Sequence, residues 1–392
     1  MNISQLKYLL PVTFLIIMFA GCQNKEDVTN TNDVNANTNA IVENNDNTRI
    51  NSTVDTDMLE TWKSDQILFS CTQEINVFNI SKNAIINILV DNEFYFSNIG
   101  INKEKIFFLR SSDLNKGKIS VIDPFGPNEI FRMNFDGTHL EQITDDSYED
   151  INLSVLGSRE EIFYVSERNT LDSRERWQLI AYDINNKSER ILYSNNEQFI
   201  PILSPSGNKI AILQFTKDYS GIYVYDINNE SIIQLAQSAK IIGSAVSWVS
   251  RDDSIVYAAF DKDKYKIYDV ELGTDISKML LEVSEQPESI SISTNNDLLI
   301  IESVDTNTIW ENGARNLWLY KFADKEMISI HTGNRFRHNA IIDKTGNVLA
   351  YFIDNEQEND KLVLYDLQDE ELISEINSTC SYINQAEWIT IE

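Results

Sequence analysis

The chain has 392 residues and a formal net charge of −29 at pH 7, from 61 acidic and 32 basic residues. A field of that sign repels nucleic-acid phosphates and anionic lipid surfaces, so neither is expected as a direct partner. Acidity of this kind keeps an exported protein soluble. A cationic substrate or calcium is the alternative, and no DxDxDG loop or other ordered calcium motif supports it.

The first 22 residues have the organisation of an export signal. Lys7 gives the only positive charge before an apolar stretch, Tyr8 to Phe19, that is too short to cross a bilayer. The next residues, Phe19-Ala20-Gly21-Cys22, resemble the lipobox of bacterial lipoproteins, although that family usually has an aliphatic residue at the position of Phe19. The resemblance implies a signal peptide over 1–21 and a lipidated Cys22. The alternative is an ordinary secretory signal with an incidental cysteine.

Residues 22–57 are rich in Asn, Thr and Asp and almost free of large apolar side chains. Such a segment cannot bury enough surface to offset the entropy of ordering, so we predict a disordered tether. The expected location is extracytoplasmic, with the protein lipid-anchored to the outer leaflet of the cell membrane or to the outer membrane. Contact with the membrane is expected through the amino-terminal lipid only.

A short apolar and aromatic phrase then returns seven times. Its copies read INVFN, IFRMN, LIAYD, IYVYD, YKIYD, LWLYK and KLVLYD, and they end at Asn79, Asn134, Asp183, Asp226, Asp269, Lys321 and Asp366. The copies are 43 to 55 residues apart. A period of about 40 to 50 residues that contains several short strands is typical of a β-propeller blade.

Hairpin patterns lie between the copies, and the clearest is FIPILSPSGNKIAILQF at 199–215. Its segment Ser204–Ala211 resembles the SPDGKxIAF signature of the WD-repeat-like propellers found in TolB and in the amino-terminal domains of prolyl-oligopeptidase relatives. The stretch IFRMNFDGTHLEQIT at 130–144 is similar to the other half of that repeat. The resemblance covers essentially all of 62–392. It implies a TolB-like β-propeller and protein partners in the cell envelope.

We therefore predict an all-β fold over 58–392, a seven-bladed β-propeller of four-stranded antiparallel blades. Six complete blades are expected to start near Phe94, Asp150, Phe199, Gly243, Pro287 and His338. The seventh combines one carboxyl-terminal strand, 383–391, with amino-terminal strands at 65–71, 74–80 and 84–90. Trp388 follows Asp366 by the same interval as Trp248 follows Asp226, which supports this closure.

Cys71 and Cys380 both fall in that closing blade. An oxidising location permits a disulfide between them, which would lock the two ends of the ring. Alignment on the Trp248 blade places the two cysteines about five residues out of register, which argues against a bridge. Both alternatives, a disulfide between the two cysteines and two free thiols, therefore stay open.

The sequence offers little catalytic chemistry. Its three histidines, His139, His331 and His338, are not at metal-ligand spacing, and HExxH, CxxC, GxSxG, GxGxxG and P-loop motifs are absent. Oligogalacturonate lyases also resemble TolB-like propellers, but they depend on several histidines around a metal. We expect no catalysis, no metal and no cofactor; a metal-dependent lyase or hydrolase is the alternative.

The insertions fall between the second and third strands of three blades, at 110–128, 167–176 and 304–316, while the connections between first and second strands are short. One face of the ring is therefore elaborated, and loops on a rigid scaffold often carry recognition. Arginine and aromatic residues, which dominate binding energy at interfaces, gather there. The candidate partner surface consists of Asp123, Phe125, Arg174, Arg176, Trp310, Arg315, Arg335, Phe336, Arg337 and His338. The alternative is structural: Trp310 covers a blade edge and the arginines pair with nearby acids.

The leading hypothesis is a lipid-anchored, non-catalytic protein-binding or scaffolding module of the cell envelope. Its partner would be an envelope protein or peptide, and the protein itself is expected to be a monomer. One alternative is a hydrolase or lyase that acts on envelope or extracellular polymers. Another is a carbohydrate-binding propeller in which Trp310 and Phe125 stack on sugars.

Overall fold

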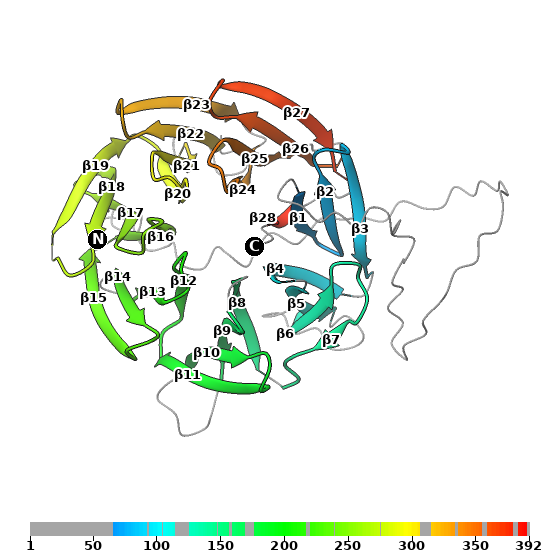
Figure 1. The fold of residues 1–392 in the computed structure, drawn as a ribbon. Helices are drawn as coiled ribbons and strands as arrows, with labels where there is room; N and C mark the ends of the chain where they lie inside the picture. The colour runs from blue at the N-terminus through cyan, green and yellow to red at the C-terminus, as the bar shows by residue number, and fades with distance from the viewer. Residues whose placement is uncertain are drawn as a thin grey trace, which may run out of the picture. The chain divides into compact units, whose positions relative to one another are not determined.

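The computed structural model describes residues 66–389, except for short gaps at 92–93, 104, 114–124, 147, 157–158, 169–175, 217–219, 239, 275, 306–314, 334–335, 355–358 and 379–382. All of the secondary-structure elements in these residues are β-strands. The strands form seven four-stranded antiparallel sheets arranged as blades around a ring (Figure 1). The described residues contain no helix suited to span a membrane. The prediction of a seven-bladed β-propeller is confirmed.

We number the blades from the first complete one and give their strands from the centre outward. Blade 1 contains β4 (Phe94–Asn102), β5 (Lys105–Asp113), β6 (Phe125–Asn134) and β7 (Glu141–Gln142). Blade 2 contains β8 (Glu149–Val155), β9 (Glu161–Glu167), β10 (Trp177–Asp183) and β11 (Ser188–Asn195). Blade 3 contains β12 (Phe199–Leu203), β13 (Lys209–Phe215), β14 (Ser220–Asp226) and β15 (Ser231–Ser238). Blade 4 contains β16 (Ile241–Trp248), β17 (Ser254–Asp261), β18 (Lys264–Glu271) and β19 (Ser277–Val283).

The remaining blades complete the circle. Blade 5 contains β20 (Gln286–Ile292), β21 (Leu298–Val304), β22 (Arg315–Lys321) and β23 (Glu326–Gly333). Blade 6 contains β24 (Phe336–Ile342), β25 (Val348–Ile353), β26 (Lys361–Asp366) and β27 (Glu371–Asn377). Blade 7 contains β28 (Ile383–Trp388), β1 (Gln66–Cys71), β2 (Glu74–Asn79) and β3 (Ala84–Val90). All six complete blades start within two residues of the predicted positions.

Blade 7 closes the ring as the sequence predicted. The carboxyl-terminal β28 pairs with β1 in antiparallel register, with Trp388 opposite Ile67. Two amides of β28 also reach blade 1: Asn384 Nδ2 donates to the carbonyl of Phe96 at 2.8 Å, and Gln385 Nε2 donates to that of Ile99 at 3.2 Å. The last described strand is therefore bonded on both of its sides to sequence roughly 300 residues away.

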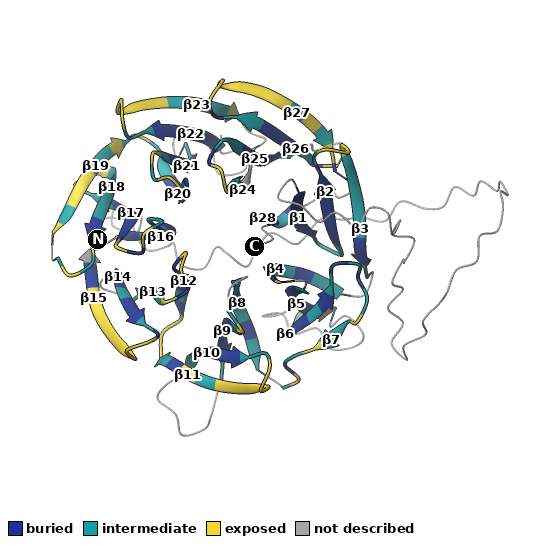
Figure 2. Ribbon diagram, viewed as in Figure 1, coloured by how far each residue is buried: buried dark blue, intermediate teal, exposed yellow. Residues whose placement is uncertain are grey.

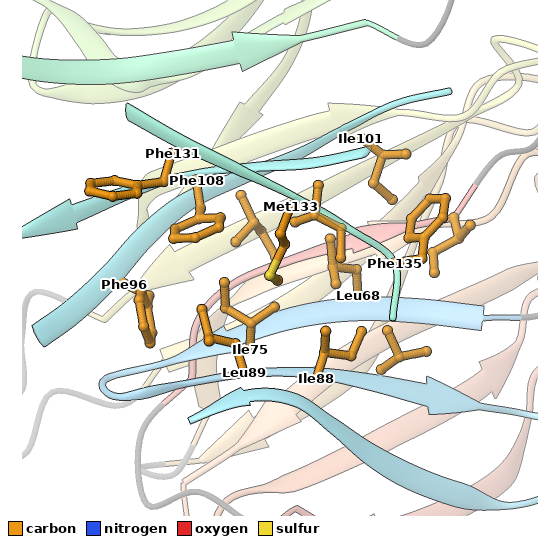
Figure 3. Close-up of a cluster of buried hydrophobic side chains, with 14 residues drawn as sticks. Leu68, Ile75, Ile88, Leu89, Phe96, Ile101, Phe108, Phe131, Met133 and Phe135 are labelled. Atoms are coloured by element: carbon orange, nitrogen blue, oxygen red, sulfur yellow. The ribbon is translucent and has the colours of Figure 1, made fainter. Parts of the chain in front are cut away.

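The hydrophobic core lies between successive blades rather than at the centre of the ring. Strand β1, for example, is buried along its whole length because each face of its blade packs on a neighbour. Figure 3 shows one such cluster, in which Leu68 and Ile75 of blade 7 meet Phe108 and Met133 of blade 1. A strand buried on both faces needs a continuous apolar run, which explains phrases such as QILFSC and KIFFLR.

The small polar residue that ends the repeated phrase shapes the turn into the outer strand. Asp183 Oδ1 accepts hydrogen bonds from the backbone N–H groups of Asn185 and Asn186, at 2.9 and 2.8 Å. The turn then ends at Lys187, which has a φ of 52°. Asp226 and Asp366 make the same pair of bonds in their own turns. An Asx turn that leads into a left-handed residue reverses the chain tightly, so these three phrases are each followed within a few residues by an edge strand.

The outer strands are protected against pairing with other chains. In six blades the ladder between the third and fourth strands is interrupted by a β-bulge or irregularity. In blade 1 the fourth strand, β7, is only two residues long. Bulged or very short edge strands are poor templates for further strands. These strands still carry exposed apolar side chains, such as Ile233 and Ile373, on the outer rim (Figure 2).

Candidate functional site

The two faces of the ring differ in their connections. Connections between first and second strands are two to five residues long in blades 1 to 6. Those between second and third strands reach eleven residues at 114–124, nine at 168–176 and ten at 305–314. Because the strands alternate in direction, these long connections share one face with the turns that lead from one blade to the next. We call it the long-loop face and the opposite one the short-turn face.

Hydrogen bonds between neighbouring turns hold the short-turn face together. Asn102 Nδ2 donates to the carbonyl of Leu156 at 2.8 Å, which joins blades 1 and 2. Arg159 donates to the carbonyl of Gly207, and the Ser204 hydroxyl donates to Asp252 at 2.9 Å. The links continue from Ser250 N to Asn296 Oδ1 and from Thr294 Oγ1 to the carbonyl of Lys344. This chain of contacts runs through blades 1 to 6 and makes the short-turn face rigid.

The predicted partner surface is only partly described. Arg176 and Arg315 have described side chains. Phe336, Arg337 and His338 lie on β24 and Phe125 begins β6, but their side chains are not described. The residues outside the described part of the chain are Cys22, Asp123, Arg174, Trp310, Arg335 and Cys380. All of the surface residues that can be placed lie at the long-loop end of their strands.

Both described arginines are paired, as the structural alternative expected. Arg176 is ion-paired with Glu167, and its guanidinium lies 5.6 Å from the ring centroid of Trp177. Arg315 Nε lies 3.7 Å from Glu288 Oε2. Their side chains are nevertheless 51% and 34% exposed. Exposed pairs of this kind contribute little to stability, so both guanidinium groups can still accept a carboxylate from a partner.

The placed residues fall into two groups on the long-loop face. Phe125 begins β6 of blade 1, and Arg176 immediately precedes β10 of the neighbouring blade 2. Arg315 lies opposite Gly333 in blade 5, immediately before β24 of blade 6. Blade 7 separates the two groups on one side of the ring, and blades 3 and 4 separate them on the other (Figure 1). A partner that touched both groups would have to cross blade 7, blades 3 and 4, or the centre of the ring.

A buried ion pair lies between the two groups, at the junction of blades 7 and 1. Arg110 Nη2 donates to Asp91 Oδ2 at 2.7 Å, and both side chains are about 95% buried. The guanidinium lies 3.5 Å from the ring centroid of Phe94 and 4.9 Å from that of Phe131. The sequence analysis did not single out this pair, because nothing local to either residue reveals that the other is near.

Buried acids between blades 1 and 2 were also missed. Asp150 at the start of β8 is fully buried, and burial raises its pKa to about 7, with the hydroxyls of Ser166 and Thr144 offsetting part of the effect. Burial likewise raises the pKa of Glu129 on β6 to about 7. The only sequence signal was an acid, Asp150, at the start of an inner strand, where apolar or small residues are usual in this chain.

A polar network borders these acids. Arg168 donates to Glu189 Oε2 at 2.7 Å and lies 3.8 Å from Asp146 Oδ2. The Tyr164 hydroxyl donates to the other oxygen of Glu189, at 2.7 Å, and burial raises the pKa of this phenol. The backbone N–H of Arg168 donates to the carbonyl of Arg176 at 2.8 Å, which closes the base of the connection between β9 and β10. The network thus joins the buried acids to an exposed arginine of the long-loop face.

The histidines do not converge. His139 follows β6 in blade 1, and His331 lies on β23 in blade 5, where burial lowers its pKa. Within the described residues, no group of three or more His, Cys, Asp or Glu side chains could hold a metal ion.

Cys71 is disulfide-bonded. It lies opposite Ile383 of β28, at a point where the register between β1 and β28 shifts. The predicted partner, Cys380, is three residues before Ile383 in sequence and outside the described residues. A bridge between Cys71 and Cys380 therefore stays a prediction, but the register that argued against it is locally irregular.

No family model and no curated protein matches the sequence. Solved structures do match the fold. TolB from Acinetobacter baumannii is 9% identical, with a TM-score of 0.50 over 84% of this chain and 86% of TolB. The chain has a TolB-like propeller fold.

Enzyme structures share the fold as well. A puromycin hydrolase S511A mutant complexed with PGG is 12% identical, with a TM-score of 0.60 over 79% of this chain and 52% of that one. An oligogalacturonate lyase in complex with manganese is 9% identical, with a TM-score of 0.58 over 77% of this chain and 85% of the lyase. The chain spans about half the length of the puromycin hydrolase. At these identities the likeness shows the fold alone, and it includes both TolB and enzymes.

Proposed function

We propose that the protein is a lipid-anchored, extracytoplasmic β-propeller that acts as a non-catalytic protein-binding or scaffolding module of the cell envelope. The observation that carries this proposal is the difference between the two faces. Long connections emerge from one face only, while the other is closed by hydrogen bonds between successive turns.

A rigid ring with loops on one face favours recognition of a macromolecule. The strands hold the two ends of each long connection in place, while the sequence and length of the connection itself can vary. Arg176 and Arg315 occupy two such ends, in blades 2 and 5. A partner that engaged both would need to bridge about half of the ring, which suits a folded protein or an extended peptide better than a small molecule.

Charge indicates the chemistry of the partner. The chain carries a net charge of −29, yet Arg176 and Arg315 both lie at the long-loop end of their strands. A basic region in an acidic protein attracts acidic segments of a partner. We therefore propose a partner that offers carboxylates to Arg176 and Arg315 in place of Glu167 and Glu288.

The anchoring half of the proposal depends on the amino-terminal sequence. Lipid on Cys22 and a flexible segment over 22–57 would hold the ring about 30 Å from the membrane surface. At that distance the protein could reach envelope partners without contact between its acidic surface and the lipid headgroups.

Crosslinking in intact cells tests the binding surface. The double variant Arg176→Ala, Arg315→Ala removes two positive charges from the long-loop face. The matched control, Arg251→Ala with Lys344→Ala, removes two positive charges from exposed positions on the short-turn face. We expect the first variant to lose most of the crosslinked partner and the control to keep it. Equal recovery with both variants would contradict the proposed surface.

Turnover assays test the non-catalytic half. The purified protein would be assayed with peptide and polyuronide substrates, with and without added divalent metal. We expect no turnover above a boiled control. Reproducible turnover that followed the protein through purification would replace the scaffolding proposal with an enzymatic one, whatever the crosslinking experiment showed.

A further inference from the structure

Three polar side chains form a row across blade 2, on the side that faces blade 1. Asp150 on β8 lies directly opposite Ser166 on β9, and Ser166 lies directly opposite Gln178 on β10. Side chains directly opposite each other in a ladder have Cβ atoms about 5 Å apart. Asp150 and Ser166 are fully buried and Gln178 is half-buried.

The oxygens of this row lack hydrogen-bond partners among the described residues. Both carboxylate oxygens of Asp150, the Ser166 hydroxyl and the side-chain carbonyl of Gln178 are buried without one. Buried polar atoms are nearly always hydrogen-bonded in folded proteins, so four such atoms in adjacent side chains call for an explanation.

The surroundings offer the Asp150 carboxylate little compensation. An apolar cluster that includes Leu109, Leu153 and Ile162 fills this interface between blades 1 and 2. The guanidinium of Arg168, on the same side of blade 2, is bonded to Glu189 and lies close to Asp146. The charged and titratable groups around the row, from all elements packed there, are Glu129, Asp145, Asp146, Glu149, Tyr164, Arg168 and Glu189. Five of these seven are acids, so the environment disfavours another negative charge.

Protonation suits this carboxyl better than ionisation. When Asp150 is ionised it can only accept hydrogen bonds, and the hydroxyls of Ser166 and Thr144 are the donors available to it. A buried carboxylate with few donors, in apolar and acidic surroundings, is unfavourable. A proton on Asp150 removes the charge and adds a hydrogen that the carboxyl can donate.

We propose that Asp150 is the proton-binding centre of a pH-responsive element: the neutral carboxyl suits this buried site, and its ionisation loosens the β8–β9 side of the interface between blades 1 and 2. The ligand of this site is a proton, supplied by the solvent. The element is independent of the partner surface, and it stands or falls separately from the proposed function.

The direction of the pKa shift agrees with the geometry. Burial raises the pKa of Asp150 from 3.8 to about 7 in the folded protein. A carboxyl whose pKa is higher in the folded than in the unfolded state stabilises the fold most below its unfolded pKa. That contribution is fully present below about pH 4, declines as the pH rises, and is lost once the pH has passed about 7. Glu129, whose pKa is raised in the same way, adds to the trend.

Amide hydrogen exchange of the mature, full chain tests the element. Protection would be measured from pH 5 to pH 8.5, with each amide corrected for its intrinsic exchange rate, and β8 and β9 compared with β16 and β17 of blade 4. In the wild-type protein we expect protection in β8 and β9 to fall by up to tenfold per pH unit up to about pH 7 and then to level off. Protection in β16 and β17 should change much less.

Asp150→Asn supplies the neutral mimic, because its amide adds a donor and cannot ionise. We expect the variant to lose the pH dependence of β8 and β9, while the control Asp324→Asn, which changes an exposed acid in a turn of blade 5, keeps the wild-type profile. A flat wild-type profile in β8 and β9 would overturn the proposal even if Asp150→Asn failed to fold. So would a pH dependence that persists unchanged in Asp150→Asn.

Discussion

Trp248 and Trp388 make the same hydrogen bond at two places in the ring. The indole of Trp248 donates to the carbonyl of Ile202, in the inner strand of the preceding blade, at 2.8 Å. The indole of Trp388 donates to the carbonyl of Ile341, again in the inner strand of the preceding blade, at 3.3 Å. The carboxyl-terminal strand thus takes the place of an ordinary inner strand, although its own blade is built from both ends of the chain.

This relationship predicts equal effects of equivalent substitutions. Trp248→Phe and Trp388→Phe each remove the donor and leave a carbonyl without this partner, so we expect each to lower the free energy of unfolding by about 1–3 kcal/mol. Urea unfolding followed by fluorescence would measure it. Trp177→Phe, which removes a half-buried indole at the edge of blade 2, is the control and should cost less. A much smaller effect at Trp388 than at Trp248 would mean that the closing strand is loosely held.

The ion pair of Arg110 and Asp91 predicts a large asymmetry. Arg110→Met should destabilise the protein by about 3–5 kcal/mol, because it removes the cation that neutralises the buried Asp91 carboxylate. Arg315→Met removes an arginine from a partly exposed pair and should cost at most about 1 kcal/mol. Thermal and urea unfolding of the two variants would check the contrast. Similar losses for both would indicate that the Arg110 pair is accessible to water.

Lipidation predicts a clean change in cell fractionation. Cys22→Ala should move the protein from the membrane fraction to the soluble extracytoplasmic fraction, because one cysteine carries the anchor. Cys71→Ser, which changes a buried cysteine inside the ring, should stay with the membrane. The prediction fails if Cys22→Ala remains membrane-bound after a high-salt wash, since the anchor would then lie elsewhere.

The disulfide of Cys71 predicts a specific peptide pair. Digestion without reduction should yield a peptide that contains Cys71 joined to one that contains Cys380, since those two cysteines belong to the blade that closes the ring. Reduction should then lower the free energy of unfolding by about 2–4 kcal/mol. Recovery of Cys380 as a free thiol would rule out this pairing and would leave the partner of Cys71 to be found.

The sequence was sufficient for the fold because its signals are local and repeated. Several phrases end in a residue such as Asp183 or Asp226 whose side chain shapes the next turn, and this chemistry can be read without knowledge of any neighbour. The matched positions of Trp248 and Trp388 placed the final strand correctly. The exact first residue of a strand was less predictable. Strand β24 begins at Phe336 rather than His338, because a bulge between Arg337 and Ile341 adds residues to this strand.

The polar groups between blades could not be predicted in the same way. Asp150 is buried because blade 1 covers it, and Asp91 is buried against Arg110 from the next blade. In each case the decisive contact joins segments whose juxtaposition depends on the finished ring. Single-sequence reasoning could place Arg176 and Arg315 on one face, since that follows from connection lengths, but it could not tell which acids they pair with.

The arrangement of blade 7 also dictates the order in which the chain can finish folding. Strands β1, β2 and β3 leave the ribosome first among the described strands, and their fourth partner, β28, leaves last. The backbone groups on the inner edge of β1 therefore stay unpaired with their native partner while the six other blades are synthesised. A nascent chain that is halted anywhere before Ile383 has an unsealed circle and a vacant strand position, which gives quality-control proteases and chaperones a direct mark of incomplete synthesis.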